Sequence, residues 1–167
     1  MKYVWISGGG IVTLVIIVLA IGYSLPVKHR GTGESTFNAS PDALFALITN
    51  VDAFPAWRSG VKTVETIRST DGRLRFRELS ANGAIAYVVE SAESNRRVVT
   101  RIDDKSLPFG GTWTYELLPA SGGRTTLRIT EDGEIYNPVF RFVSRFFMGY
   151  DVTIKTYLAD VARKVGG

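Results

Sequence analysis

The sequence predicts an α+β domain in which an antiparallel sheet packs on a long C-terminal helix, preceded by one transmembrane helix. Three observations support this fold class. The N-terminus holds a long stretch without charged side chains, the middle of the chain alternates between apolar and polar residues, and the C-terminal part repeats apolar residues at spacings of three and four. Alternation is typical of strands, and the longer spacing is typical of helices. We therefore expect an anchor (residues 1–26), a linker (27–33) and one domain (34–167).

The N-terminal stretch is long enough to cross a bilayer. Tyr3–Leu25 contains no Asp, Glu, Lys, Arg or His, and a helix of roughly 20 apolar residues spans the hydrocarbon core. Trp5 and Tyr23 lie near its ends, where aromatic rings favour the headgroup layer. A cleaved secretory signal is the alternative, with Lys2 as its basic region, but the uncharged stretch is longer than a signal needs. We expect a single-pass membrane protein and take the cytoplasm as the side of the domain, although positive charges flank the helix almost equally.

Composition excludes several kinds of site. The chain has no cysteine, which excludes disulfides, thiolate catalysis and Cys-ligated metals. Its net charge is +4, and the basic residues are scattered along the predicted strands, which argues against nucleic-acid binding. The one histidine, His29, lies in the expected linker and is interpreted as an interfacial polar residue. Asp103-Asp104 and Glu131-Asp132 lack the spacing of a calcium loop, so we expect no metal and no cofactor.

The domain begins with a strand followed by a capped helix. Gly33–Ala39 is the expected strand. Ser40 and Pro41 are typical of an N-cap and a first helical position, so a helix is predicted over Pro41–Thr49. Asn50–Ser59 is expected to be irregular or a short helical segment.

Six further strands are predicted after Gly60, where the period becomes two. In the second of them, Leu74 and Phe76 face one side, while Arg73, Arg75 and Arg77 face a solvated outer side. Asn82-Gly83 indicates a tight hairpin, and consecutive strands joined by short turns predict an antiparallel meander. The six strands are Val61–Ser69, Arg73–Leu79, Ala84–Ser91, Arg96–Ile102, Thr112–Leu118 and Arg124–Glu134.

The last segment is predicted as one long amphipathic helix. Asn137-Pro138 caps it, and it runs to about Val165, with Gly149 expected to bend its middle. Phe140–Met148 mixes basic and bulky apolar residues, which fits either a surface leaning on a membrane or a solvated basic edge. One apolar stripe is expected to contain Val139, Val143, Phe146, Tyr150, Ile154, Tyr157 and Val161.

The order of these elements resembles the START-like (SRPBCC) superfamily, which includes polyketide cyclase/dehydrase and lipid transport-like proteins. Phe37–Thr49 resembles the family's first strand and helix, and Val51–Trp57 resembles the segment that follows. Leu25-Pro26 is similar to the end of the membrane helix in a subset of these proteins. The resemblance covers roughly residues 27–165. It implies the helix-grip fold, in which a curved sheet of about seven strands grips the last helix around a cavity for lipids, sterols, quinones or polyketides.

A cavity is also expected from the residues themselves. One aromatic sheet face meets one aromatic helix face, and a pocket remains where the rings do not fill the space. The alternative is a fully packed core. The expected ligand-binding residues are Trp57, Leu74, Phe76, Glu78, Tyr87, Trp113, Tyr115, Val143, Phe146, Tyr150 and Ile154.

Glu78 is the one candidate for acid–base chemistry, because it shares strand parity with Leu74 and Phe76. A carboxylate in the cavity would have a raised pKa; alternatively it lies in water or pairs with an arginine such as Arg101. Our leading hypothesis is a non-enzymatic, membrane-anchored module that binds or carries a hydrophobic small molecule or lipid. The alternatives are a cyclase or dehydrase that uses Glu78 and a cavity tyrosine, and a regulator with a filled core and an unknown protein partner.

Overall fold

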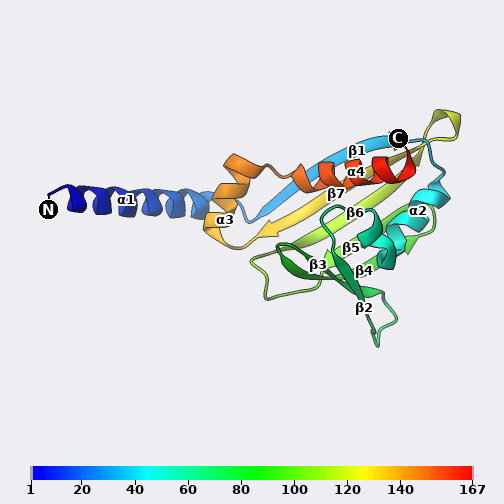
Figure 1. Cartoon of the computed structure of the whole chain (residues 1–167), viewed down its shortest axis with the longest axis horizontal. Coiled ribbons are helices and arrows are strands. Elements are labelled where there is room, and N and C mark those ends of the chain that lie inside the picture. Colours follow the sequence, from blue (N-terminus) through cyan, green and yellow to red (C-terminus); the bar gives the residue numbers. More distant parts are fainter. Residues whose placement is uncertain (1, 167) are drawn as a thin grey trace.

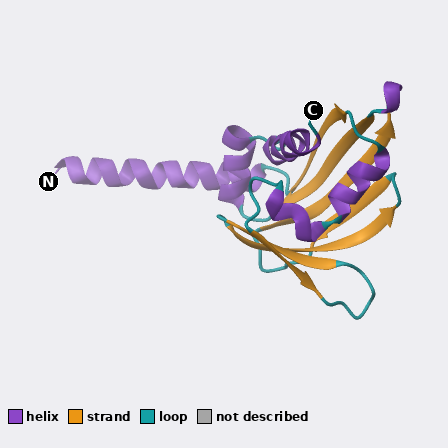
Figure 2. Ribbon diagram, turned by 45° about the vertical axis from the view of Figure 1, so that its right-hand side comes forward, coloured by secondary structure: helices purple, strands orange, loops and turns teal. Residues whose placement is uncertain are grey.

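A curved antiparallel sheet with helices in its concave side forms the body of the molecule, and one long helix projects from it (Figures 1 and 2). The computed structural model describes residues 2–166, with side chains from Gly10 onward. The projecting helix is α1 (Lys2–Ser24). Within the part of the chain thus described, no helix combines the length and the apolar character that crossing a membrane requires.

The sheet has seven strands in the order β1-β7-β6-β5-β4-β3-β2, and all pairs are antiparallel. Strands β2 to β7 therefore form the predicted meander, and β1 pairs with β7 as an edge strand of the sheet. The hairpin that Asn82-Gly83 indicates joins β3 to β4, where Ser80 pairs with Gly83. The strands are β1 (Lys28–Phe37), β2 (Thr63–Ile67), β3 (Arg75–Ser80), β4 (Gly83–Glu93), β5 (Arg97–Ile102), β6 (Phe109–Pro119) and β7 (Thr125–Ile135).

The core lies between the concave face of the sheet and three helical segments: α2 (Pro41–Thr49), the 3-10 helix η1 (Val51–Ala56) and α4 (Val152–Val165). Helix α2 has the predicted bounds, with Ser40 accepting a hydrogen bond from the Ala43 amide. The strands alternate as expected, so one residue in two faces these helices. The buried core includes Phe37, Leu44, Ile48, Phe54, Phe76, Tyr115, Leu127, Ile129, Ile154, Tyr157 and Val161.

The segment expected to be a linker is part of the sheet, so that prediction is wrong. Residues 28–33 begin β1, which pairs with β7 from Lys28 opposite Glu134 onward. A polar run with two glycines is typical of a linker, but the long edge of β7 supplies hydrogen-bond partners that turn it into a strand. The glycines have a role here, because a Cβ at Gly31 or Gly33 would press on Tyr150 or Ile154 as the C-terminal segment passes over β1.

The predicted single C-terminal helix is broken into three pieces. Helix α3 (Pro138–Val143) continues into a π-helical turn, η3 (Ser144–Met148), and α4 starts only at Val152. Gly149 between them has a φ of 78°, a left-handed conformation that glycine adopts readily. Because of this break, the expected apolar stripe is present only in α4: Ile154, Tyr157 and Val161 are buried, whereas Phe146 is 57% exposed.

Helix α1 is fastened to the domain at its C-terminal end, where it packs on α3 (Figure 1). Gly22 lies directly against the Pro138 backbone, and a Cβ there would overlap it. The buried Arg141 donates a hydrogen bond from Nη1 to the Leu25 carbonyl oxygen at 2.6 Å. The last carbonyls of a helix lack partners within the helix, so Arg141 satisfies a backbone group just beyond the end of α1.

Candidate functional site

A cavity of about 1240 Å³ lies between the concave face of the sheet and the helical segments that cover it. Its volume exceeds the range of several hundred to about 1000 Å³ that is usual for small-molecule pockets. The filled core that the regulator hypothesis requires is therefore not observed. Seven of the expected binding residues line the cavity: Leu74, Phe76, Glu78, Tyr87, Trp113, Tyr115 and Tyr150.

The other four expected residues, Trp57, Val143, Phe146 and Ile154, are not among the residues that line it. Trp57 is buried in the core, edge-on to Tyr157 with ring centroids 5.4 Å apart. Ile154 is fully buried over the glycines of β1. Val143 and Phe146 belong to α3 and η3, which the Gly149 break separates from the gripped helix. The prediction for these two fails because it assumed one continuous helix.

The first polar group in the cavity is an ion pair between Glu78 and Arg58. Arg58 lies two residues after the end of η1, and its guanidinium donates a hydrogen bond to Glu78 Oε1. The guanidinium carbon also lies 4.9 Å from the Phe54 ring centroid and 5.1 Å from that of Tyr157, which stabilises the cation. Burial raises the pKa of Glu78, and the positive charge of Arg58 opposes this shift.

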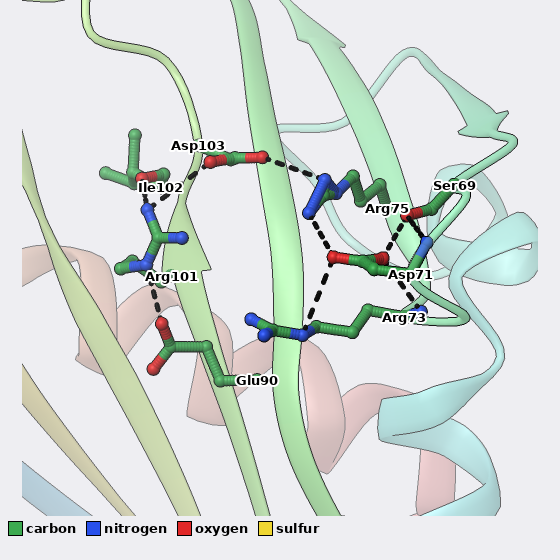
Figure 3. A network of polar contacts seen from close by, with 8 residues as sticks. All are labelled: Ser69, Asp71, Arg73, Arg75, Glu90, Arg101, Ile102 and Asp103. Atoms are coloured by element: carbon green, nitrogen blue, oxygen red, sulfur yellow. Dashed lines mark hydrogen bonds and ion pairs between the residues drawn. The ribbon is translucent and has the colours of Figure 1, made fainter.

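Arg101, suggested as a partner of Glu78, lies instead in a charged network on the outer side of the sheet (Figure 3). It contacts Glu90 at 2.6 Å and Asp103 at 3.4 Å. Asp103 and Asp71 in turn pair with Arg75. Strand pairing aligns Arg75 and Arg101 on either side of Val88, which is fully buried. The stems of the two arginines therefore flank an apolar residue on the outer face.

The second polar group in the cavity, His29 with Glu131, was not expected from the sequence. His29 Nε2 lies 3.8 Å from Glu131 Oε1, and both residues line the cavity. The imidazole stacks on the Tyr150 ring at a centroid distance of 4.2 Å. Opposite His29 in the strand pairing stands Gly133, where a Cβ would overlap the imidazole. Glycine at that position therefore makes the space that the ring occupies.

This second pair lacks a permanent positive charge. Burial raises the pKa of Glu131 to about 7, and a hydrogen bond from the Trp113 indole only partly opposes it. Burial also lowers the pKa of His29, so the imidazole is mostly neutral near pH 7. Its side chain is 10% exposed, and Nδ1 has no hydrogen-bond partner among the described residues.

Residues 28–33, interpreted above as a linker, contain an alternation that indicates the inward position of His29. In residues 28–33 the polar residues Lys28, Arg30 and Thr32 alternate with His29 and the two glycines. That is a period of two, the spacing of a strand with His29 on its inner face. Glycine is not counted as an apolar residue, so this alternation does not resemble the apolar–polar pattern of a strand.

Tyrosine hydroxyls complete the polar lining. Tyr87 stacks on Phe76 at 5.3 Å, and Tyr115 lies 5.4 Å from Tyr157 between ring centroids. Burial raises the pKa of all three tyrosines far above the physiological range, so they remain neutral hydroxyls. Within the described residues, no group of three or more His, Cys, Asp or Glu side chains is arranged to hold a metal ion.

Comparison with known proteins gives one family and many structural relatives. Residues 28–164 match the family model described as polyketide cyclase / dehydrase and lipid transport. No curated protein matches the chain. Among solved structures, a START superfamily protein from Mycobacterium smegmatis is 17% identical, with a TM-score of 0.65, over 83% of this chain and 97% of that one.

Two enzymes are similar to a comparable degree. The Zhui aromatase/cyclase from Streptomyces sp. R1128 is 13% identical, with a TM-score of 0.64, over 83% of this chain and 92% of that one. A truncated norcoclaurine synthase from Thalictrum flavum is 10% identical, with a TM-score of 0.66, over 83% of this chain and 94% of that one. At these identities the likeness concerns the fold, and it confirms the predicted α+β helix-grip architecture of the domain.

Proposed function

Since the chain belongs to the polyketide cyclase / dehydrase and lipid transport family, we propose that it binds a hydrophobic molecule in the cavity between its sheet and α4. The observation that carries the proposal is the cavity itself, about 1240 Å³ in volume and lined largely by aromatic and aliphatic side chains. Burial of an apolar ligand there removes apolar surface from water on both partners, which is the main source of affinity in such pockets.

Binding of an apolar probe to the full-length chain tests this proposal. The neutral fluorophore N-phenyl-1-naphthylamine is titrated into the protein in detergent and into two variants with the same substitution on opposite sheet faces. Thr100 lines the cavity, whereas Thr114 lies on the outer face, between the inward-facing Trp113 and Tyr115. We expect Thr100→Phe to weaken binding at least tenfold and Thr114→Phe to leave it unchanged. Equal binding by all three proteins, or none by the unmodified chain, would contradict the proposal.

The function further includes anchoring by α1 in a membrane, with the domain on the cytoplasmic side. What supports anchoring is the uncharged stretch Tyr3–Leu25 and the outward-facing apolar side chains of the described part of α1. Ile11 is 64% exposed and Leu14 61%. Such a surface on a projecting helix is costly to leave in water.

Topology is testable because the chain has no cysteine of its own. Ser121→Cys places one thiol in an exposed turn of the domain. In intact cells, a membrane-impermeant maleimide should leave this thiol unlabelled, and permeabilisation should expose it. Recovery of the chain in the soluble fraction after lysis would contradict the anchor, and labelling of intact cells would contradict the cytoplasmic side.

A second candidate function is a cyclase or dehydrase in which Glu78 acts as acid or base with a cavity tyrosine. The similarity to an aromatase/cyclase favours it, and so does the position of Glu78 in the cavity beside Arg58. Incubation of the protein with a linear polyketide thioester distinguishes enzyme from carrier. Turnover that Glu78→Gln abolishes while N-phenyl-1-naphthylamine still binds would identify an enzyme. Binding without turnover in the unmodified chain would leave the carrier function.

A further inference from the structure

We propose that His29 and Glu131 form the headgroup site of the cavity and select ligands whose polar end is a neutral hydroxyl, an alcohol or a phenol. This inference rests on the proposed function, because it needs a ligand in the cavity. It adds the chemistry of that ligand's polar end and the two side chains that recognise it.

The distance between the two polar atoms of the pair suits a hydroxyl that bridges them. His29 Nε2 and Glu131 Oε1 are 3.8 Å apart, too far for a hydrogen bond to each other. A ligand oxygen placed beside them can lie about 2.8 Å from both atoms, which is the usual hydrogen-bond distance. A hydroxyl placed there accepts from the imidazole N–H and donates to the carboxylate, which uses both of its capacities.

The surrounding residues hold this site open toward the cavity. In the strand pairing, Gly133 stands opposite His29 and Gly31 stands opposite Glu131. Neither glycine carries a side chain that could cover the pair, and Tyr150 fixes the imidazole by stacking. The side chain of His29 is nine-tenths buried, so a hydrogen bond to its Nε2 forms away from bulk water, where it is stronger.

The electrostatics of the site discriminate against anionic headgroups. No Arg or Lys among the described residues forms an ion pair with Glu131. A ligand carboxylate or phosphate has no proton to donate to Glu131 and meets its negative charge above pH 7. A hydroxyl meets no such repulsion. In the other polar pair, Glu78 already balances the charge of Arg58, so this pair attracts an anionic headgroup less than a free arginine would.

Three pyrene probes that differ only at one substituent test the selection at pH 8: 1-pyrenemethanol, 1-methylpyrene and 1-pyrenecarboxylate. Affinities are measured by fluorescence anisotropy with the full-length chain in detergent. All probes partition into micelles, so each affinity is compared between proteins in the same micelles. His29→Phe keeps a ring that stacks on Tyr150 and removes both nitrogens. Glu131→Gln keeps the shape of the side chain and removes its charge. Thr114→Val is the control, because it removes a hydroxyl from the outer face of the sheet, away from the cavity.

We expect His29→Phe to weaken 1-pyrenemethanol about tenfold and 1-methylpyrene less than twofold. Glu131→Gln should strengthen 1-pyrenecarboxylate about tenfold, because the repulsion disappears, and Thr114→Val should leave all three affinities within twofold. If His29→Phe weakens the alcohol and the methyl probe equally, the headgroup site is wrong while the cavity function stands. If the unmodified chain binds none of the probes, the proposed function fails and the headgroup site fails with it.

Discussion

Glu78 and Glu131 line the same cavity, and their surroundings differ. Glu78 meets the guanidinium of Arg58, which two aromatic rings hold in place. Glu131 meets only a mostly neutral imidazole and an indole N–H. Burial raises the pKa of both, but only at Glu78 does a fixed cation oppose the shift. A compensated carboxylate is held by its partner, whereas an uncompensated one remains available to a ligand. The four predictions below test this difference, beginning with the largest effect.

Removing the charge of Glu78 should destabilise the domain. Glu78→Gln leaves the largely buried Arg58 without its counter-charge, and breaking such a pair costs about 3 kcal/mol. Urea unfolding at pH 7 measures the change. The double variant Arg58→Met/Glu78→Leu is the control, and it should recover most of the loss because it removes both charges. A loss below about 1 kcal/mol for Glu78→Gln would mean that Arg58 does not compensate Glu78, and the contrast with Glu131 would disappear.

The matched substitution at Glu131 should have the opposite sign. The pKa of Glu131 is about 7 in the folded chain, above its ordinary value of 4.5. Its contribution to stability is therefore full below about pH 4.5 and is lost as the pH rises through 7. Glu131→Gln escapes this loss and should be more stable than the unmodified chain by about 2 kcal/mol at pH 8.

Urea unfolding of both proteins at pH 4.5 and pH 8 checks the sign. Near pH 4.5 the two stabilities should converge, because the protonated acid and the amide are nearly equivalent. Destabilisation by Glu131→Gln at pH 8 would mean that a cation compensates Glu131 in solution, and the contrast with Glu78 would disappear.

The space that holds His29 should depend on glycine. Gly133→Ala places a methyl group where the imidazole lies, and such overpacking costs about 1.5 kcal/mol. Combined with His29→Ala, the same substitution should cost less than about 0.5 kcal/mol, since the overlapping ring is gone. A double-mutant cycle of unfolding free energies measures this coupling. Additive effects would show that His29 does not occupy the position beside Gly133.

The smallest effect is expected outside the cavity. Asp71 pairs with Arg73 and Arg75 on the outer face (Figure 3), where water screens the charges. Asp71→Asn should shift the urea midpoint by no more than the experimental error. The shift at Glu78 is the reference within the same chain. A midpoint shift of similar size at both positions would show that ion pairing alone, without burial, accounts for the loss at Glu78.

Most of the sheet could be predicted from local pattern. The alternation in β3 places Phe76 and Glu78 on one face, and both are buried there. The Asn82-Gly83 turn and helix α2 follow from residues that are close in sequence. These features depend on near neighbours, which is why the sequence alone predicts them.

The features that the sequence did not predict depend on residues that are distant in the chain. Arg58 reaches Glu78 only because η1 folds over the sheet, and no spacing in the sequence encodes that approach. His29 enters the cavity because β7 recruits residues 28–33 as a strand. Val143 and Phe146 do not line the cavity, because Gly149, expected to bend a helix, separates two helical pieces. The polar half of the candidate site is therefore a product of tertiary pairing.

The junction between α1 and the domain has one more consequence. Only residues 25–27 separate the last residue of α1 from the first of β1. The carbonyl oxygen of Leu25, the first of them, accepts a hydrogen bond from Arg141. This short connection and its hydrogen bond restrict rotation of α1 relative to the sheet. The direction of α1 therefore sets the orientation of the sheet and of the cavity that it encloses.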